Sequence, residues 1–182
     1  VTSPIVQKRL MEAGATELIL RQCNLEDAPF ILELVNSPDW LRFIGDRNIH
    51  SIEDAQRSIS EIYHPMYEQP GCGPLAICSP QHRTPLGTVG LYKRPYLKEP
   101  DLGFALLPKY RGKGMAAAAS QILLEQAKNN YGITKLNAIT MKENCASIAL
   151  LNRLGFSLID AITPPNEQQS LLRYQINLLE EK

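Results

Sequence analysis

The sequence predicts one α/β domain, an α+β arrangement on a mixed, mostly antiparallel sheet of six to seven strands with about four helices. Segments with strand character alternate with segments of helical periodicity along the 182 residues. No linker rich in Gly, Ser or charge divides the chain, so residues 1–182 are taken as one domain. One helical segment separates two strand segments within 101–141, and this order predicts a single parallel strand–helix–strand crossover.

The first half of the chain is predicted to contain one strand and two helices. Glu17–Arg21 has the composition of a short strand. Asn24 is a good N-cap for a helix that stops before Pro38. Ser51 begins a second helix, which Pro65 is expected to end. Residues 1–16 are expected to be a loosely ordered extension, because they show no clear periodicity.

The second half supplies the rest of the sheet. Strands are predicted at 75–78, 86–93, 101–107, 136–141, 156–163 and 171–177. One helix begins close to Gly114. Another is capped by Asn144 and ends at Gly155, where a left-handed residue is favoured. The last two strands are joined by a Pro-Pro loop and should form an antiparallel pair.

The composition excludes several function classes. Lys and Arg total 19, as do Asp and Glu, so no net charge draws the chain to nucleic acid or to an acidic membrane surface. The four cysteines form no C-x-x-C pair and none lies at metal-ligand spacing, which predicts free thiols and no metal site. No apolar run approaches the length of a signal sequence or a membrane span. A cytoplasmic protein is therefore expected.

The segment 107–116 contains the residues that most clearly predict a binding site. Gly112 and Gly114 free the backbone between a predicted strand and a predicted helix, so that its N–H groups can point outward. The helix N-terminus adds positive partial charge, and Arg111 and Lys113 add full charges. This combination predicts a site for a phosphate or pyrophosphate. The alternative is a glycine-containing loop that only starts a helix.

The same segment also matches the pattern G-x-G-x-x-A, at Gly112, Gly114 and Ala117, which is typical of dinucleotide-binding folds. That fold needs an acidic residue about 20 positions later, at the end of the next strand. The first candidate, Glu143, lies further along the chain than this spacing requires, and only one helix and a strand pair follow it. A dinucleotide binder is therefore the weaker interpretation.

Two blocks of the sequence resemble the GNAT (GCN5-related N-acetyltransferase) superfamily. The pattern R-x-x-G-x-A at 111–116 matches the family's (Q/R)-x-x-G-x-(G/A) signature. The block NCASIALLNRLGF at 144–156 is similar to a later stretch of the family, and the spacing between the blocks suits one helix and one strand. The segments WLRFIG at 40–45 and SIEDA at 51–55 resemble the RimJ/RimL-like branch, which includes ribosomal-protein N-terminal acetyltransferases.

The resemblance implies an N-acetyltransferase that uses acetyl-CoA as the donor and a primary amine as the acceptor. It implies that backbone groups of Ala105, Leu106 and Leu107 bind the pantetheine arm, and that an N–H near Ala105 stabilises the oxyanion. It implies that the diphosphate lies on the backbone of a loop and first helical turn, which comprise Arg111, Gly112, Lys113, Gly114, Met115 and Ala116.

Proton transfer is harder to assign. Many family members carry a Tyr acid seven positions after the Asn of the second block, but this chain has Leu151 there. Ser147 is the candidate substitute, although Asn144 and Ser147 could only cap the helix. Asp101, with Glu99 just before it, could hold the water that deprotonates the amine, or could be an exposed carboxylate at a strand start.

The acceptor site is predicted near Trp40, Phe43 and His50. The two aromatic residues could equally be core, and His50 could be a solvent-exposed histidine. The acceptor is expected to be a protein N-terminus or a small-molecule amine, and the protein a monomer or a homodimer. A non-catalytic CoA-binding module stays open as a second function class, because the expected Tyr is missing at Leu151.

Overall fold

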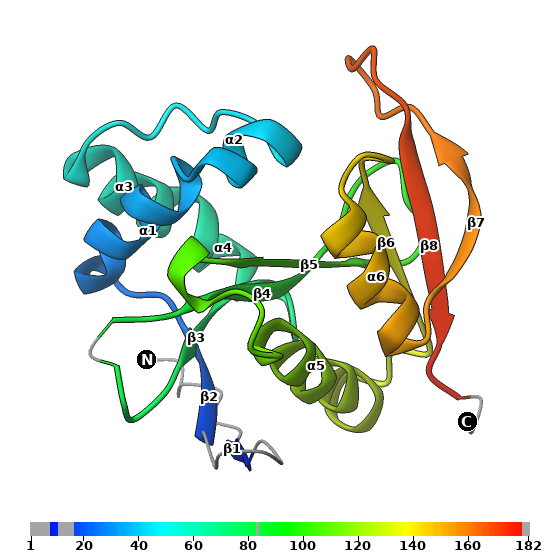
Figure 1. Ribbon diagram of the computed structural model, residues 1–182, viewed down its shortest axis with the longest axis horizontal. Coiled ribbons are helices and arrows are strands. Elements are labelled where there is room, and N and C mark those ends of the chain that lie inside the picture. The colour runs from blue at the N-terminus through cyan, green and yellow to red at the C-terminus, as the bar shows by residue number, and fades with distance from the viewer. Residues whose placement is uncertain (1–7, 11–16, 83, 180–182) are drawn as a thin grey trace.

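One mixed sheet of eight strands forms the centre of the structure, a computed structural model that describes residues 8–10, 17–82 and 84–179 (Figure 1). In order across the sheet the strands are β1 (Lys8–Leu10), β2 (Glu17–Gln22), β3 (Gly73–Cys78), β4 (Gly87–Tyr92), β5 (Asp101–Leu106), β6 (Lys135–Thr140), β8 (Leu171–Asn177) and β7 (Ser157–Ile162). The longer helical segments are α1 (Ala28–Val35), α2 (Pro38–Phe43), α3 (Ile52–Ser58), the π-helical η2 (Ile59–Tyr63), α5 (Met115–Tyr131) and α6 (Cys145–Leu154).

The topology confirms the predicted fold class. Every pair of neighbouring strands is antiparallel except β5 and β6, which are parallel and joined through α5. A doubly wound parallel sheet is thus absent from the described residues, and the dinucleotide-binding interpretation is wrong. The strand β1 was not predicted: it lies inside the expected extension 1–16 and pairs with β2. Residues 1–7 and 11–16 of that extension lie outside the described residues.

Helices cover both faces of the sheet, and this explains why the central strands are apolar on both sides. In β3, Leu75 and Ile77 pack into the core cluster that includes α5 and α6. Ala76, which points to the opposite face, packs into a second cluster with residues of α1 and α3. Because alternate residues of a strand face opposite sides, two separate cores stabilise one strand.

Capping interactions at three helix starts and a left-handed glycine at one helix end account for several of the observed boundaries. Asn24 and Asp27 form a reciprocal capping box, and Ser51 Oγ accepts a hydrogen bond from the backbone N–H of Asp54 at 3.0 Å. At the end of α6, Gly155 has φ +95° and the N–H of Phe156 donates to the carbonyl of Leu151 at 3.0 Å.

One predicted helix boundary needs correction. The short apolar segment from Trp40 to Ile44, for which a helical turn and a lining loop were both open, lies mostly in the helix α2. Pro65 does not end its helix, which continues into α4 (His64–Met66) after the π-helical turn η2. Pro65 lies in the first turn of α4, where a missing N–H is tolerated, so the expectation that it terminates the helix is wrong.

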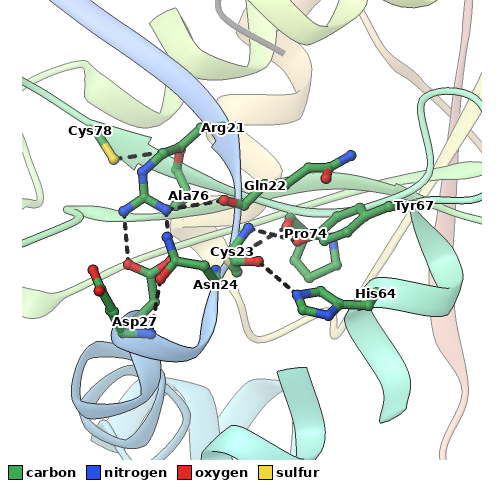
Figure 2. Close-up of polar contacts among 11 residues, drawn as sticks. Arg21, Gln22, Cys23, Asn24, Asp27, His64, Tyr67, Pro74, Ala76 and Cys78 are labelled. Carbon is green, nitrogen blue, oxygen red and sulfur yellow. Dashed lines mark hydrogen bonds and ion pairs between the residues drawn. The ribbon is translucent and has the colours of Figure 1, made fainter. Parts of the chain in front are cut away.

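A polar cluster links β2 to the start of α1, as Figure 2 shows. The guanidinium of Arg21 donates to both carboxylate oxygens of Asp27, at 2.7 and 2.8 Å. Asp27 also accepts the backbone N–H of Asn24 at 2.9 Å and is buried. A buried carboxylate that accepts three hydrogen bonds fixes the direction in which the chain leaves the sheet.

The same cluster ties β2 to α4 and β3 (Figure 2). The hydroxyl of Tyr67 accepts the backbone N–H of Cys23 at 3.0 Å and donates to the carbonyl of Pro74. His64 Nε2 lies 3.2 Å from the carbonyl oxygen of Cys23. The backbone groups that β2 leaves unpaired at its end therefore find partners on side chains.

Replacing Asp27 with alanine is expected to lower the free energy of unfolding by about 2–3 kcal/mol, because the half-buried guanidinium of Arg21 and the N–H of Asn24 lose their acceptor. Urea denaturation measures this change. The neighbouring Glu26→Ala is the control: Glu26 is exposed, and its loss should cost less than about 0.5 kcal/mol. Equal effects of the two substitutions would contradict the role given to the cluster.

The described residues contain no helix long and apolar enough to cross a membrane. They also contain no group of three His, Cys, Asp or Glu side chains placed to hold a metal ion. All four cysteines are free thiols: Cys23 and Cys72 are buried, Cys78 is half-buried and Cys145 is exposed.

Candidate functional site

The loop between β5 and α5 ends in a helix N-terminus with free backbone donors. After the 3-10 turn Pro108–Tyr110, Gly112 and Gly114 adopt φ values of +75° and +76°, and Gly114 is the N-cap of α5. The first intrahelical hydrogen bond runs from Ala118 N–H to the Gly114 carbonyl at 3.1 Å. The N–H groups of the preceding three residues therefore have no acceptor within the helix. A 17-residue helix that starts in this way attracts an anion.

Strands β5 and β6 are paired at one end only. Their only paired residues are Asp101 and Asn137, and Asn137 N–H donates to the Pro100 carbonyl at 2.9 Å. Beyond this point β6 continues beside β8 while β5 continues beside β4, so a gap opens between β5 and β6 (Figure 1).

A cavity of about 800 Å³ occupies this gap and extends past it. The side near the gap is lined by residues of β5, β6 and the N-terminal turns of α5 and α6. The cavity is also lined by α2, by the loop after it, by η2 and by the loop that joins β7 to β8. It thus extends from the helix N-terminus at Gly114 to α2, and its part next to α2 is called the chamber under α2.

The register of β5 shows which backbone groups face the gap. Leu107 N–H donates to the Leu86 carbonyl at 2.9 Å, and the pair formed by Ala105 and Thr88 lies two residues further along the same ladder. Because hydrogen-bonded pairs alternate with non-bonded pairs, the backbone groups of Phe104 and Leu106 point away from β4 and into the gap.

This register revises the predicted pantetheine contacts. Leu107 uses its N–H within the sheet, is buried and does not line the cavity. Ala105 and Leu106 both line it. Phe104, which was not predicted, lines the cavity and has its backbone directed into the gap. The alternation of an antiparallel strand identifies it once the register is known.

The side chain of Arg111 is engaged by the protein itself. Its Nε and Nη2 atoms donate to the Leu106 carbonyl at 3.2 and 3.0 Å, and its Nη1 atom pairs with the carboxylate of Asp39 in α2. Arg111 therefore fixes the loop against β5 and against α2. Lys113 is exposed, and the described residues offer it no ion-pair partner.

Asp101 is a buried carboxylate in the cavity wall. Only 2% of the residue is exposed, so the interpretation of Asp101 as an exposed carboxylate at a strand start is wrong. Its Oδ1 atom accepts a hydrogen bond from Arg94 Nε at 2.6 Å. Burial raises the pKa of Asp101, and the adjacent Arg94 guanidinium opposes that rise.

Tyr92 lies beside this ion pair. In the β4–β5 register it is directly opposite Asp101, and the Arg94 guanidinium carbon lies 5.8 Å from the centre of its ring. Burial raises the pKa of Tyr92, so its hydroxyl stays protonated. Tyr92 and Arg94 both line the cavity and were missed by the sequence analysis, although the short connection between two predicted strands indicated that their ends would meet.

The start of α6 brings two predicted residues to the cavity. Asn144 accepts the backbone N–H of Ser147 at 3.2 Å, so it does cap the helix, and both residues also line the cavity. Ser147 is half-buried. Leu151 lines the cavity from the next turn and is 1% exposed, so an apolar side chain occupies the position where a phenol was expected.

The predicted acceptor residues separate into two groups. Trp40 and Phe43 line the chamber under α2. His50 does not: its side chain is 62% exposed, its ring lies 3.9 Å from Asp46, and the cavity wall does not include it. The prediction that His50 contacts the acceptor is unsupported by its position. Tyr63, whose pKa burial raises to about 12, lines the chamber and was missed, since nothing in the sequence marks which face of η2 is turned inward.

This chain is similar in sequence to known acetyltransferases. The family model described as acetyltransferase (GNAT) domain matches residues 17–157. The uncharacterized N-acetyltransferase YoaA of Bacillus subtilis (strain 168) is 24% identical over 140 residues, which are 76% of this chain and 78% of that protein.

Solved structures share the fold. The ribosomal-protein-S5-alanine acetyltransferase from Vibrio fischeri has a TM-score of 0.77 at 14% identity, covering 97% of this chain and 99% of that chain. The microcin C7 self-immunity acetyltransferase MccE, in complex with acetyl-CoA and AMP, has a TM-score of 0.74 at 17% identity, covering 88% and 92%. Because the family model matches more than half of the chain, this protein belongs to the GNAT acetyltransferase family.

Proposed function

We propose that this acetyltransferase moves an acetyl group from acetyl-CoA directly to a primary amine, with both substrates bound at once. The observation that carries the proposal is the gap between β5 and β6, which ends at the free N–H groups of α5. Such a gap can hold an extended amide-containing arm beside a strand, while the helix N-terminus holds a diphosphate.

The residues present suit acetyl-CoA. A Cβ atom added at Gly112 would meet nothing within 4 Å, so the loop leaves open space above its backbone. The N–H groups of Met115 and Ala116 stand at the positive end of α5 and would donate to the diphosphate. In the gap, the backbone of Phe104 and the N–H of Leu106 would bond the pantetheine amides, because the Leu106 carbonyl already accepts from Arg111.

The reaction requires one bond to form and one to break. The amine nitrogen attacks the thioester carbonyl carbon, a C–N bond forms, and the C–S bond breaks. A backbone N–H of β5 that faces the gap would stabilise the oxygen that becomes negative during the attack. The amine loses a proton, and the leaving thiolate gains one.

Asp101 is the residue we assign to the amine proton. Its raised pKa brings the carboxylate closer to working pH than an exposed aspartate, while Arg94 keeps it ionised. Ser147 is assigned to the thiolate, because it is the hydroxyl that α6 places in the cavity wall where Leu151 offers no proton. Because Leu151 cannot donate a proton, the second candidate function, a CoA-binding module without turnover, also has to be tested.

The resemblance to the RimJ/RimL-like branch extends the proposal to the acceptor. It rests on the segments 40–45 and 51–55, of which the first forms part of α2 in the chamber wall. Peptides that begin with alanine therefore belong in the acceptor screen beside small amines. Thiol release from acetyl-CoA, with mass spectrometry of the products, distinguishes an enzyme from a binding module.

Gly114→Glu is expected to weaken acetyl-CoA binding by about 100-fold or more. The new carboxylate would repel the diphosphate and block at least two charged hydrogen bonds, each worth about 1.5–3 kcal/mol. Isothermal titration calorimetry measures the change in Kd.

The matched control is Gly132→Glu. Gly132 has φ +63° at the other end of α5, so the two substitutions impose similar backbone strain, and a Cβ there meets nothing within 4 Å. It should keep wild-type affinity. If a folded Gly114→Glu protein bound acetyl-CoA as tightly as Gly132→Glu does, the assigned diphosphate site would be refuted.

A further inference from the structure

The side chains that line the cavity include more positive than negative charges. Two ion pairs, Arg94 with Asp101 and Arg111 with Asp39, satisfy both acids that lie on β5 and α2. The remaining charged residues of the wall have no ion-pair partner among the described residues, and they are Arg42, Arg47, Arg153 and Glu167. The cavity wall therefore carries more positive than negative charge that is free for a ligand.

Arg42 and Arg47 line the part of the cavity under α2 and are both exposed to solvent. Arg42 lies in the last turn of α2, with its guanidinium carbon 4.7 Å from the centre of the Phe43 ring. Arg47 follows in the loop after α2, and its charge acts on the phenol of Tyr63, whose pKa it lowers against the larger effect of burial. Arg153 also lines the cavity but comes from α6.

The rest of the chamber offers little to a second cationic group. The carboxylate of Asp101 is already bonded to Arg94, so it is not free to pair with a second cation. Glu167, in the loop between β7 and β8, is the one acid of the wall without an ion pair in the described part of the chain. An acceptor with several positive charges would lie close to two uncompensated guanidinium groups.

We propose that the acceptor of this enzyme is a primary amine that also carries a negative group, a carboxylate or a phosphate, and that Arg42 and Arg47 bind that group. The planar guanidinium donates two parallel hydrogen bonds to either anion, which gives orientation as well as attraction. With the anion held under α2, the amine end of the same molecule would reach toward Asp101 and the gap. The inference rests on the proposed acetyl transfer, because it names the class of acceptor for that reaction.

The test compares amines that differ only in charge. Phosphoethanolamine is paired with ethanolamine, and the C-terminally amidated dipeptide Ala-Glu with Ala-Gln. At saturating acetyl-CoA, kcat/KM is expected to be about tenfold or more higher for the anionic member of at least one pair, the size expected of a charged hydrogen bond in a partly exposed site. The pair that shows the larger ratio identifies phosphate or carboxylate.

The double variant Arg42→Gln/Arg47→Gln should remove this preference. Its kcat/KM for the anionic amine should fall by about tenfold, and its kcat/KM for the neutral partner should change less than twofold. The control is Arg57→Gln: Arg57 pairs with Asp54 at 3.5 Å on α3 and does not line the cavity, so the preference should survive.

Three results would overturn the inference: equal kcat/KM within both pairs, a preference for spermidine over the anionic amines, or an unchanged preference in the double variant. Failure of the proposed function has a different signature, namely no turnover of any amine. In that event, calorimetric titration of phosphoethanolamine and Ala-Glu amide into the CoA-loaded protein gives the decision. Binding that the neutral partners lack and the double variant loses supports the inference, and its absence refutes it.

Discussion

Replacing Arg94 with methionine is expected to lower the free energy of unfolding by about 3–5 kcal/mol at pH 7, and by less at pH 5. The substitution keeps an unbranched side chain but leaves the carboxylate of Asp101, 2% exposed, without its partner at 2.6 Å. Urea denaturation at several pH values measures the effect.

The pH dependence follows from the direction of the pKa shift. Burial raises the pKa of Asp101 above its unfolded value, and Arg94 opposes that rise, so removal of Arg94 raises the pKa further. A carboxyl group whose pKa is higher in the folded state favours folding when it is protonated, and this contribution is lost as pH rises. In Arg94→Met the loss should therefore grow from about pH 4, near the unfolded pKa, toward neutrality.

Two controls separate this effect from loss of packing. Lys93→Met removes the adjacent, exposed cation and should change stability by less than about 0.5 kcal/mol. Asp101→Asn combined with Arg94→Met removes both charges and should recover part of the stability, with little pH dependence. A pH-independent loss in the single variant would show that the ion pair is not its cause.

Asp101→Asn is expected to lower kcat/KM by about 100-fold or more while leaving the Kd for acetyl-CoA within about twofold of the wild type. The amide cannot accept the amine proton, but it keeps the shape of the carboxylate. In the wild type, activity should rise with pH as Asp101 ionises, above the usual carboxyl range because its pKa is raised. The variant should lack that rise. A pH-rate profile with a good amine acceptor measures both effects.

Glu99→Gln provides the comparison for Asp101→Asn. Glu99 lies two residues earlier in the chain and does not line the cavity, and it contributes its backbone carbonyl to Asn137 at 3.1 Å. Its carboxylate should be dispensable for turnover. If Asp101→Asn kept full activity, or if both variants lost it equally, another group would have to accept the proton.

Local signals in the sequence were enough for most of the fold. The strand 171–177 has the predicted bounds, and the caps at Asn24, Ser51 and Asn144 start helices as expected. These features depend on neighbouring residues along the chain, which a sequence displays directly. Strand β1 depends on pairing with β2, and its three residues carry no periodicity of their own.

The site was predictable where it is made of contiguous backbone, and less so where it depends on register. The loop at Gly112 and Gly114 has the left-handed backbone that the sequence suggested. In β5 the pairing with β4 turns the backbone of Phe104 and Leu106 into the gap and that of Ala105 toward β4, which the sequence alone could not show. Likewise, the burial of Asp101 depends on Arg94, which reaches it from the loop after the neighbouring strand.

The single pair between β5 and β6 has a consequence for how this protein can be stabilised. Pairing the two strands along their whole length would give the backbone of Phe104 and the N–H of Leu106 permanent partners and would stabilise the protein without substrate. The same change would close the gap in which we propose that acetyl-CoA binds. Selection for thermal stability alone would thus favour variants in which β5 and β6 pair fully and activity is lost. This strand boundary therefore sets a trade-off between stability and catalysis.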